Sequence, residues 1–430
     1  MYTFKYHRIH LQTYCRLIVW PLLVIVILVA VMVRNAGYLE VARIPPIEAI
    51  HIKRASEMIK SNKNTHIVVI GAGASGLSAA YTLEYLGLPY TVLEASSTIG
   101  GRVLEMADFV NVPLDLGAEW IHVMPRVLQD LLLFEGDDAT GIDIIEYQPQ
   151  SISVYAKGKR RRRNWFSHFN KEYKFANTTW WSYLANFFYP HVADHVVFSS
   201  VVNRIQYSGS NNSDERVMSV TTTDGEEYTA SHVILTAPIH MLQDREITFN
   251  PNLEVSVWNA IDEVVMADGM KVWFEWDEDF YPDILFTKSI FKGIESQPIY
   301  FDAVFGKSST DANVLCLFNV NTKEASQRAM WSDEEIVNQA LDQLATIFDR
   351  DDLRDHLLQS RVQNWSREPY IRGAYTWNYG DFDQQALRKP MHQGHLFLAG
   401  EHVAAGIEYS ATVHGAAITG REAVLKILFA

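Results

Sequence analysis

The sequence predicts an α/β fold, and the main reason is a glycine-rich turn placed between a strand and a helix. His66 to Ile70 is a short apolar, β-branched run, which is typical of a buried parallel strand. Gly71, Gly73 and Gly76 follow it directly in the spacing G-x-G-x-x-G. Leu77 to Leu86 then carries apolar residues at helical intervals, and a glycine follows as a helix stop.

A second strand and an acidic residue complete this unit. Tyr90 to Leu93 is again apolar and ends in Glu94. In such a unit the glycines allow a tight turn, a close approach of backbone to a pyrophosphate, and close packing of helix on strand. The helix N-terminus faces the phosphates, and the acid accepts hydrogen bonds from ribose hydroxyls. The sequence therefore predicts a dinucleotide site.

The residues after Glu94 favour FAD over NAD. Gly100, Gly101 and Arg102 follow closely and can bring backbone and a guanidinium to the same pyrophosphate. A nicotinamide coenzyme, which leaves in each cycle, has no need of this second contact.

Composition limits the other classes. The chain has 430 residues, of which 48% are hydrophobic, enough for two domains with sizeable cores. The net charge of −14 argues against nucleic acid as the main partner. With two cysteines, Cys15 and Cys316, neither a cysteine zinc cluster nor an intramolecular disulfide is expected, and no metal site is predicted.

The N-terminal segment predicts a membrane anchor. Leu17 to Val33 is uncharged and apolar, and basic residues precede it and end it. We expect a single-pass anchor, with a location in the secretory pathway or on an extracytoplasmic face. A cleaved signal peptide is the alternative. Pro45-Pro46 then belongs to a tether, and Glu48 to Lys60 fits a short amphipathic helix.

The middle of the chain is rich in strands. Ile152 to Arg163 predicts a hairpin whose basic run is either solvated or faces an anionic membrane. The aromatic segment Asn177 to Tyr189 either lines a substrate cavity or caps a core. Val197 to Leu242 predicts a return to the nucleotide-binding domain, with a hairpin turn at Asp224-Gly225.

A lysine interrupts the apolar strand Gly269 to Trp276. Burial of Lys271 is costly unless the side chain is solvated or neutral. Taken alone, the pattern favours a lysine on an edge strand.

The C-terminal part supplies a second approach to a long cofactor. Asn364 to Tyr379 carries five aromatic residues that could pack on a flat ring. The strand His395 to Ala399 leads into Gly400-Glu401, and a helix is predicted from Thr412. Both halves of the chain are expected to hold one cofactor.

These segments together resemble the flavin-containing amine oxidase family, which includes monoamine oxidases, polyamine oxidases and flavin lysine demethylases. The resemblance covers residues 65–123 and 195–430. It rests on IVVIGAGASGLSAAYTL with its following glutamate, IGGR, DLGAEWIH, VILTAPIHML, GMKVWFEW, WSREPYIRGAYTW and LFLAGEHVAAGIEYSATVHGAAITGREA. It implies a Rossmann-like FAD-binding domain of the GR2 type and a smaller mixed-sheet substrate domain.

The resemblance also implies roles for single residues. Lys271 matches the lysine that holds a water near flavin N5, which reverses the edge-strand interpretation. His122 matches a position that faces substrate in some polyamine oxidases, and Trp365 is expected near the flavin. The expected catalytic residues are therefore Lys271, His122 and Trp365. The expected cofactor-binding residues are Gly71, Gly73, Ala74, Ser75, Gly76, Glu94, Ala95, Gly101, Arg102, Gly117, Ala118, Glu119, Trp120, Val202, Gly400, Glu401, Thr412 and Val413.

Two departures from the family pattern bear on substrate and cofactor. Only Val123 to Val197 is available for a helical substrate domain, so the site is open or is covered by other means. Thr412 holds the position of the monoamine oxidase cage tyrosine, and the C-terminal motif has no flavin-linking cysteine. Noncovalent FAD is therefore expected.

The resemblance thus implies an FAD-dependent oxidase of amines, including polyamine-like ones, with dioxygen as the second substrate. A lipid or isoprenoid desaturase and a non-catalytic, FAD-stabilised binding protein are the alternatives. The expected domains are an anchor or signal segment at 1–34, a tether at 35–64, FAD-binding parts at 65–123, 197–245 and 364–430, a reduced substrate segment with the hairpin at 124–196, and the substrate domain at 246–363.

Overall fold

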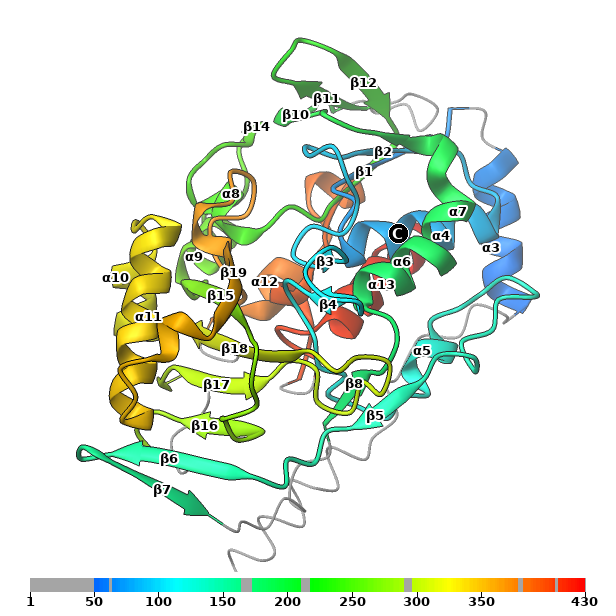
Figure 1. Ribbon diagram of the computed structural model, residues 1–430. Helices are drawn as coiled ribbons and strands as arrows, with labels where there is room; N and C mark the ends of the chain where they lie inside the picture. The colour runs from blue at the N-terminus through cyan, green and yellow to red at the C-terminus, as the bar shows by residue number, and fades with distance from the viewer. Residues whose placement is uncertain are drawn as a thin grey trace, which may run out of the picture.

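The computed structural model describes residues 50–61, 64–163, 172–209, 217–289, 296–377, 382–406 and 409–429. The described strands form three larger sheets and two two-stranded ladders. Figure 1 shows helices gathered around the α4–α13 pair and a second group of helices at α10 and α11. No helix within these residues has the length and apolar character needed to cross a membrane. The predicted anchor, Leu17 to Val33, lies outside the described residues.

A five-stranded parallel sheet forms the nucleotide-binding part. Its central strand, Ile67–Ile70, pairs with Tyr90–Leu93 on one side. On the other side it pairs with His232–Leu235, which comes from the middle of the chain. The middle segment thus contributes one strand to this sheet, and the C-terminal strand pairs next to it. The order is β20 (Leu396–Leu398), β13 (His232–Leu235), β1 (Ile67–Ile70), β2 (Tyr90–Leu93) and β9 (Val196–Val197).

Two long helices from opposite ends of the chain pack against each other beside this sheet (Figure 1). They are α4 (Ala74–Leu86) and α13 (Val413–Leu428). A Cβ on Gly420 would lie 2.0 Å from the carbonyl oxygen of Ser75, so the helices meet backbone to backbone. The predicted stop at Gly87 is confirmed by its left-handed φ of 65°.

The aromatic segment caps a core and does not line the cavity described below. It forms α6 (Trp180–Phe187) and α7 (Tyr189–Val192). Trp180 and Tyr183 are 0% and 1% exposed and pack in the cluster that contains α4. Of the two interpretations of this segment, the structure supports the core. The helices α3 (Ile50–Ser61) and α5 (Val127–Asp130) belong to the same side of the molecule.

A four-stranded sheet follows from the middle of the chain. The predicted turn at Asp224-Gly225 joins two antiparallel strands, as expected. The order is β12 (Glu227–Ala230), β11 (Met218–Thr222), β10 (Val202–Tyr207) and β14 (Thr248–Asn250). The short helices α8 (Ile239–Gln243), α9 (Val255–Glu263) and α12 (Gln384–Arg388) pack nearby.

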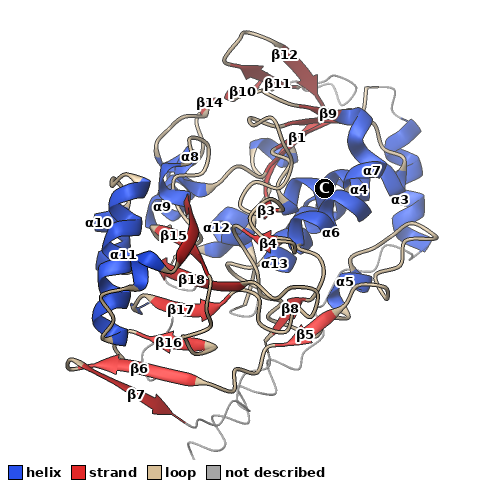
Figure 2. Cartoon of the chain, viewed as in Figure 1, coloured by secondary structure: helices blue, strands red, loops and turns tan. Residues whose placement is uncertain are grey.

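A seven-stranded mixed sheet forms the second layer, and Figure 2 shows α10 (Lys323–Arg328) and α11 (Asp333–Phe348) along one side of it. The predicted hairpin at residues 152–163 is confirmed as its last two strands. The order is β19 (Leu357–Asn364), β15 (Gly269–Trp276), β18 (Asn313–Val320), β17 (Ile299–Asp302), β16 (Ile284–Phe286), β6 (Ile152–Ala156) and β7 (Lys159–Arg163).

The position of β15 in this sheet corrects one interpretation. β15 pairs with β18 on one side and with β19 on the other, so Lys271 does not lie on an edge strand. Because side chains alternate along a strand, Met270 and Val272 face α11, whereas Lys271 and Trp273 point to the opposite side. The strand places a lysine between the two halves of the molecule.

Short ladders complete the fold. The strand predicted within Asn111 to Trp120 shrinks to two residues, and the rest is loop. The pairs are β3 (Glu105–Met106) with β4 (Leu114–Asp115), and β5 (Ile144–Glu146) with β8 (Tyr173–Phe175).

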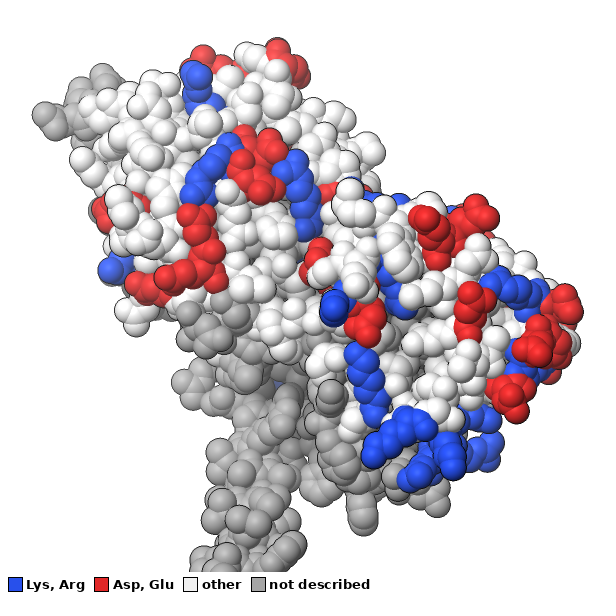
Figure 3. Space-filling model, turned by 90° about the vertical axis from the view of Figure 1, so that its left-hand side faces the viewer, with Lys and Arg blue, Asp and Glu red and all other residues white. Residues whose placement is uncertain are grey.

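On the outside, Figure 3 shows Lys and Arg side chains gathered at the lower end of one face, where the β6–β7 hairpin lies. The exposed basic residues of the hairpin are Lys157, Lys159, Arg160, Arg161 and Arg162.

Candidate active site

The glycine-rich turn after β1 presents bare backbone to a large cavity. Gly71 adopts a φ of +104°, and a Cβ on Gly76 would lie 1.8 Å from the carbonyl oxygen of Gly71. These two positions need glycine for the shape of the turn itself. Gly73 differs, because the nearest atom to its built Cβ is the carbonyl oxygen of Gly100 at 3.7 Å. The absence of a side chain at Gly73 leaves space at the cavity wall.

The carboxylate of Glu94 is fixed at the end of β2. Its Oε2 accepts a hydrogen bond from the backbone N–H of Ala72 at 2.6 Å. Its Oε1 accepts from the backbone N–H and the hydroxyl of Ser96 at 2.8 and 2.7 Å. These bonds tie the acid to the glycine-rich turn and hold it at the cavity, as a ribose-binding role requires.

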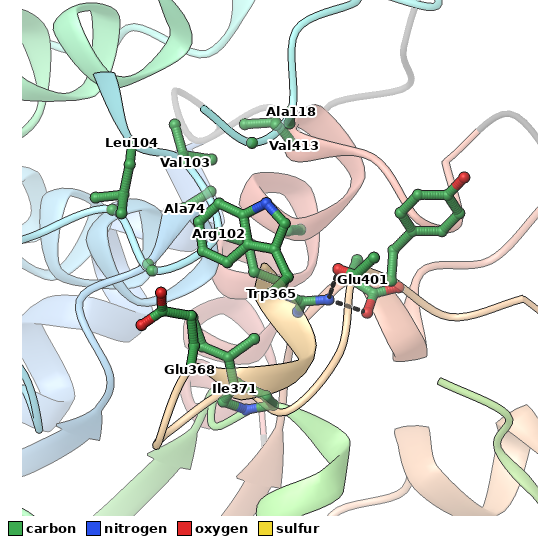
Figure 4. A pocket seen from close by; sticks show the side chains of 18 of the residues that line it. Ala74, Arg102, Val103, Leu104, Ala118, Trp365, Glu368, Ile371, Glu401 and Val413 are labelled. Atoms are coloured by element: carbon green, nitrogen blue, oxygen red, sulfur yellow. Dashed lines mark hydrogen bonds and ion pairs between the residues drawn. The ribbon is translucent and has the colours of Figure 1, made fainter. Parts of the chain in front are cut away.

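An ion pair links the N-terminal and C-terminal halves across the same cavity. Arg102 Nη1 donates to Glu401 Oε1 at 2.8 Å and to the carbonyl oxygen of Ala374 at 3.0 Å. Thr376 donates its hydroxyl to the same carboxylate at 3.0 Å. Burial acts to raise the pKa of Glu401, but the Arg102 guanidinium outweighs it, and the pKa lies below its usual value. Figure 4 shows this pair beside Trp365.

The predicted helix at the C-terminus begins where expected. Thr412 caps α13, with its hydroxyl accepting from the backbone N–H of Gly415 at 3.0 Å. Thr412, Val413 and Ala416 line the cavity, so the positive end of the helix dipole faces it.

Trp365 lies at the centre of this cavity wall. It is 4% exposed, and its indole N–H donates to the carbonyl oxygen of Leu116 at 3.3 Å. A Cβ on Gly117 would lie 2.9 Å from the indole ring. Glu368 and Glu401 lie on opposite sides of Trp365 in Figure 4. The C-terminal aromatic segment that begins at Asn364, which was expected to pack on a flat ring, therefore reaches the cavity through Trp365.

Lys271 is part of a buried ion cluster. Its ammonium donates to Glu119 Oε2 at 2.8 Å and to the carbonyl oxygen of Asp115 at 3.2 Å. The other oxygen of Glu119 lies 2.6 Å from the ammonium of Lys174 on β8. Trp120 lies beside both lysines, with its ring centroid 5.6 Å from Lys271 Nζ and 5.9 Å from Lys174 Nζ. One glutamate thus bridges two lysines in the wall.

The cluster explains how Lys271 is buried without being solvated or neutral. Burial acts to lower the pKa of Lys271, but the Glu119 carboxylate outweighs it and the pKa is raised. Burial likewise opposes ionisation of Glu119, yet Lys174 and Lys271 lower its pKa to about 2. Burial and the nearby Glu119 raise the pKa of Asp115 to about 8. At neutral pH Glu119 and Lys271 are therefore ionised, and Asp115 is mostly protonated.

His122 lies further along the same loop. Its Nδ1 lies 2.8 Å from Glu172 Oε2, and both residues line the cavity. A carboxylate at this distance fixes the ring orientation and stabilises the imidazolium when the ring takes up a proton.

These elements surround one cavity of about 1320 Å³, larger than an ordinary small-molecule site and roomy enough for a dinucleotide and a small substrate. The residues present fit FAD, because glycines, an acid at a strand end and two helix N-termini converge here. All the predicted site residues line the cavity except Gly76, which packs beneath the turn. Which of these residues contact the cofactor stays a prediction.

Several wall residues were not predicted. Glu172, Glu246 and Glu368 bring carboxylates to the cavity, and Lys174 stands behind it. Lys174 could have been found as Lys271 was, since it also interrupts an apolar strand, between Tyr173 and Phe175. The glutamates had no such signal, because they lie in loops.

Comparisons with known proteins agree with this geometry. The sequence profile of "Flavin containing amine oxidoreductase" matches residues 182–428, and that of an NAD(P)-binding Rossmann-like domain matches residues 69–135. A mouse protein, lysine-specific histone demethylase 1B, is 25% identical over 86% of this chain and 53% of its own length. The chain thus spans about half of that relative. Polyamine oxidase 1 of Zea mays is 25% identical over 82% of this chain and 88% of its own length.

Solved structures share the fold. Cyclohexylamine oxidase from Brevibacterium oxydans matches with a TM-score of 0.68 and 16% identity, over 85% of this chain and 99% of its own. A double mutant of putrescine oxidase matches with a TM-score of 0.67 and 18% identity, over 85% of this chain and 100% of its own.

Proposed function

Because the chain belongs to the family of flavin-containing amine oxidoreductases, with FAD as the family's cofactor, we propose that it is an FAD-dependent oxidase of amines. The observation that carries this proposal is a buried, charged lysine, Lys271, in the wall of the cavity that also holds the dinucleotide-binding turn. When bound, FAD would accept the hydride equivalent from the amine's C–H bond at N5, and dioxygen would reoxidise it to give hydrogen peroxide.

The chain's own residues would hold the cofactor without a covalent link. The dinucleotide would bind to the turn at Gly71 and Gly73, to Glu94 and to the N-terminus of α13. The Arg102–Glu401 ion pair would form a further part of the cofactor site. Cys316 is fully buried within β18 and does not line the cavity. Cys15 lies outside the described residues.

Lys271 would hold a water molecule toward the reacting atoms and supply it for hydrolysis of the imine product. The Glu119 bridge fixes its ammonium at the wall. His122 would orient the amine and accept its proton, because Glu172 stabilises the resulting imidazolium. Trp365 would form the flat apolar surface against the flavin.

Polyamine-like substrates are the class that this cavity fits best. Carboxylates from Glu172 and Glu368 line it and would attract the further cationic groups of such a substrate, whereas Glu246 is paired with Arg372 at 2.8 Å. The same cavity wall also carries apolar side chains, which suit a methylene chain. The apolar side chains are Ile152, Ile284, Phe286, Ile299 and Phe318.

The test is to purify the protein, record its flavin spectrum, and add a panel of mono-, di- and polyamines without oxygen. We expect yellow protein whose absorbance bleaches with at least one amine and returns with hydrogen peroxide formation when air enters. Flavin that binds but is never reduced by amines would refute the oxidase proposal and leave a desaturase or a non-catalytic binding protein. Colourless protein that takes up no FAD would refute the cofactor site as well.

We also propose that Leu17 to Val33 anchors the protein in a membrane as a single-pass segment. Its uncharged apolar sequence supports this, and the exposed basic hairpin at Lys159 to Arg162 suits an anionic bilayer surface. Resistance to alkaline extraction, with the N-terminal residues retained in the mature protein, is the expected result. A mature N-terminus beyond residue 33 would show a cleaved signal peptide instead.

A further inference from the structure

We propose that Lys174 is a positioning residue for the reaction: it holds Glu119 against Lys271 and supplies the net positive charge of the cavity wall. This inference rests on the proposed function. Lys174 touches neither the cavity nor the predicted cofactor residues other than Glu119 and Trp120 among its described contacts. Its effect on the reaction would therefore pass through the Glu119 carboxylate.

The distances in the cluster show how Lys174 would affect the position of Lys271. Lys174 is 1% exposed, and its ammonium approaches one oxygen of Glu119 at 2.6 Å, while Lys271 takes the other at 2.8 Å. A carboxylate shared in this way has one rotamer that satisfies both cations. Without Lys174, Glu119 loses the partner on the side away from Lys271 and can turn within the space left behind. The position of the Lys271 ammonium at the wall then loses its fixed support.

Charge leads to the same conclusion. Two lysines and one glutamate carry a net charge of about +1 in a buried region, where such a charge acts strongly on nearby groups. The other ionisable groups around the cluster are Asp115 on β4, Lys307 after β17, Asp302 and Cys316 on the seven-stranded sheet, and Tyr147 before β6. None of these makes a described hydrogen bond or ion pair with the Glu119 side chain, so Lys174 is the group that sets the charge of the bridge together with Lys271.

Because this charge is positive, its effect on the midpoint potential of the flavin distinguishes an electrostatic role of Lys174 from a purely structural one. A positive wall favours the added electrons of a reduced flavin, so loss of Lys174 should lower the midpoint potential of the bound flavin. Loss of the Glu119 charge should raise it. A residue that only stabilised the fold would shift both variants in the same direction or neither.

The experiment measures the flavin midpoint potential and the thermal midpoint of the full-length, FAD-bound protein at pH 7. The variants are Lys174→Met, Lys174→Arg and Glu119→Gln. We expect a lower potential in Lys174→Met, a higher one in the near-isosteric Glu119→Gln, and a value close to wild type in Lys174→Arg. In Lys174→Met, kcat for a substrate amine should fall while KM changes little, because the substrate does not touch Lys174.

Lys307→Met is the matched control. Lys307 is also buried, but its ammonium donates to the carbonyl oxygens of Phe175 and Ala176 rather than to Glu119. Its shift in potential should be smaller than that of Lys174→Met. Equal shifts in the two lysine variants, or shifts of the same sign in Lys174→Met and Glu119→Gln, would overturn the proposal. If Lys174→Met does not fold, the other two variants decide it: a raised potential in Glu119→Gln with a value near wild type in Lys174→Arg supports the proposal, and an unchanged or lowered potential in Glu119→Gln overturns it. Bleaching by amines in wild type, measured first, separates this outcome from failure of the oxidase proposal.

Discussion

Two glycines in the turn after β1 should have separable roles, one in the fold and one in cofactor binding. A methyl group on Gly76 would lie 1.8 Å from the carbonyl oxygen of Gly71 and 3.1 Å from the Thr236 hydroxyl. Because the first of these contacts is with backbone, rotation of a side chain cannot relieve it. Gly76→Ala should therefore separate α4 from β1.

The expected cost follows from what overpacking does in well-packed interiors. Inserted methyl groups cost about 1–3 kcal/mol and occasionally more. With a backbone carbonyl at this distance, we expect Gly76→Ala to lie at or above the upper end, about 3 kcal/mol. The free energy of unfolding of the cofactor-free protein, from urea denaturation, should fall by this amount.

Gly73→Ala is the matched substitution three residues earlier. Gly73 has φ −74° and ψ −176°, which alanine adopts without strain, and the nearest atom to its methyl would be 3.7 Å away. Loss of chain entropy in the unfolded state and loss of the preferred N-cap nearly cancel, so the cofactor-free protein should change by less than about 1 kcal/mol. The methyl enters the cavity where backbone should approach the pyrophosphate. We expect at least about tenfold weaker FAD binding, or about 1.4 kcal/mol.

FAD titration by flavin fluorescence, together with urea denaturation of both variants, checks the pair. The reasoning is refuted if Gly73→Ala binds FAD as tightly as wild type, or if Gly76→Ala unfolds at the same urea concentration as wild type.

Three further predictions concern the charged groups of the site. Lys271→Met should keep FAD bound but lower the turnover of amines, measured as hydrogen peroxide formation, by about 100-fold or more; a wild-type turnover would exclude Lys271 from the chemistry. Asp115 keeps its proton in the folded state up to about pH 8 but loses it near pH 4 when unfolded, so its contribution to stability is lost as pH rises through this window. The free energy of unfolding of wild type should therefore fall relative to Asp115→Asn between pH 5 and 8, and parallel pH curves would contradict this. Glu401→Gln leaves Arg102, whose side chain is 21% exposed, without its partner and should cost about 2 kcal/mol in urea denaturation, less than a fully buried pair would. Because the pKa of Glu401 is lowered in the folded state, this difference should shrink as pH falls below the ordinary range of a glutamate, and a difference that stays constant in acid would contradict it.

The parts of the fold that could be predicted are those with a local signal. The strand at Ile67, the turn with its three glycines and the helix stop at Gly87 each follow from short-range rules of backbone geometry, and the structure reproduces them. The hairpin at residues 152–163 and the strand Gly269 to Trp276 were also predictable, because alternating apolar residues and turn residues mark them.

What could not be predicted depends on which strands lie next to each other. Whether Lys271 sits on an edge strand was settled by the pairing of β15 with β18 and β19, and those strands begin more than 40 residues further along the chain. Its charge state depended on Glu119, and the charge of Glu119 depended on Lys174. Neither link has a sequence spacing that would reveal it.

The same dependence explains why a buried lysine is tolerated in this wall. An isolated ammonium removed from water would lose its proton, whereas one that shares a carboxylate with a second ammonium keeps it. Such a bridge costs more to bury than an apolar wall of equal volume, so packing alone does not account for it. Glu119 and Lys271 line the cavity that also holds the dinucleotide turn and His122, where a fixed positive charge can act on bound molecules. The bridge of Glu119 with Lys271 and Lys174 is therefore the part of this site that stability alone explains least. Substitutions in it should change the reaction rate separately from the free energy of unfolding.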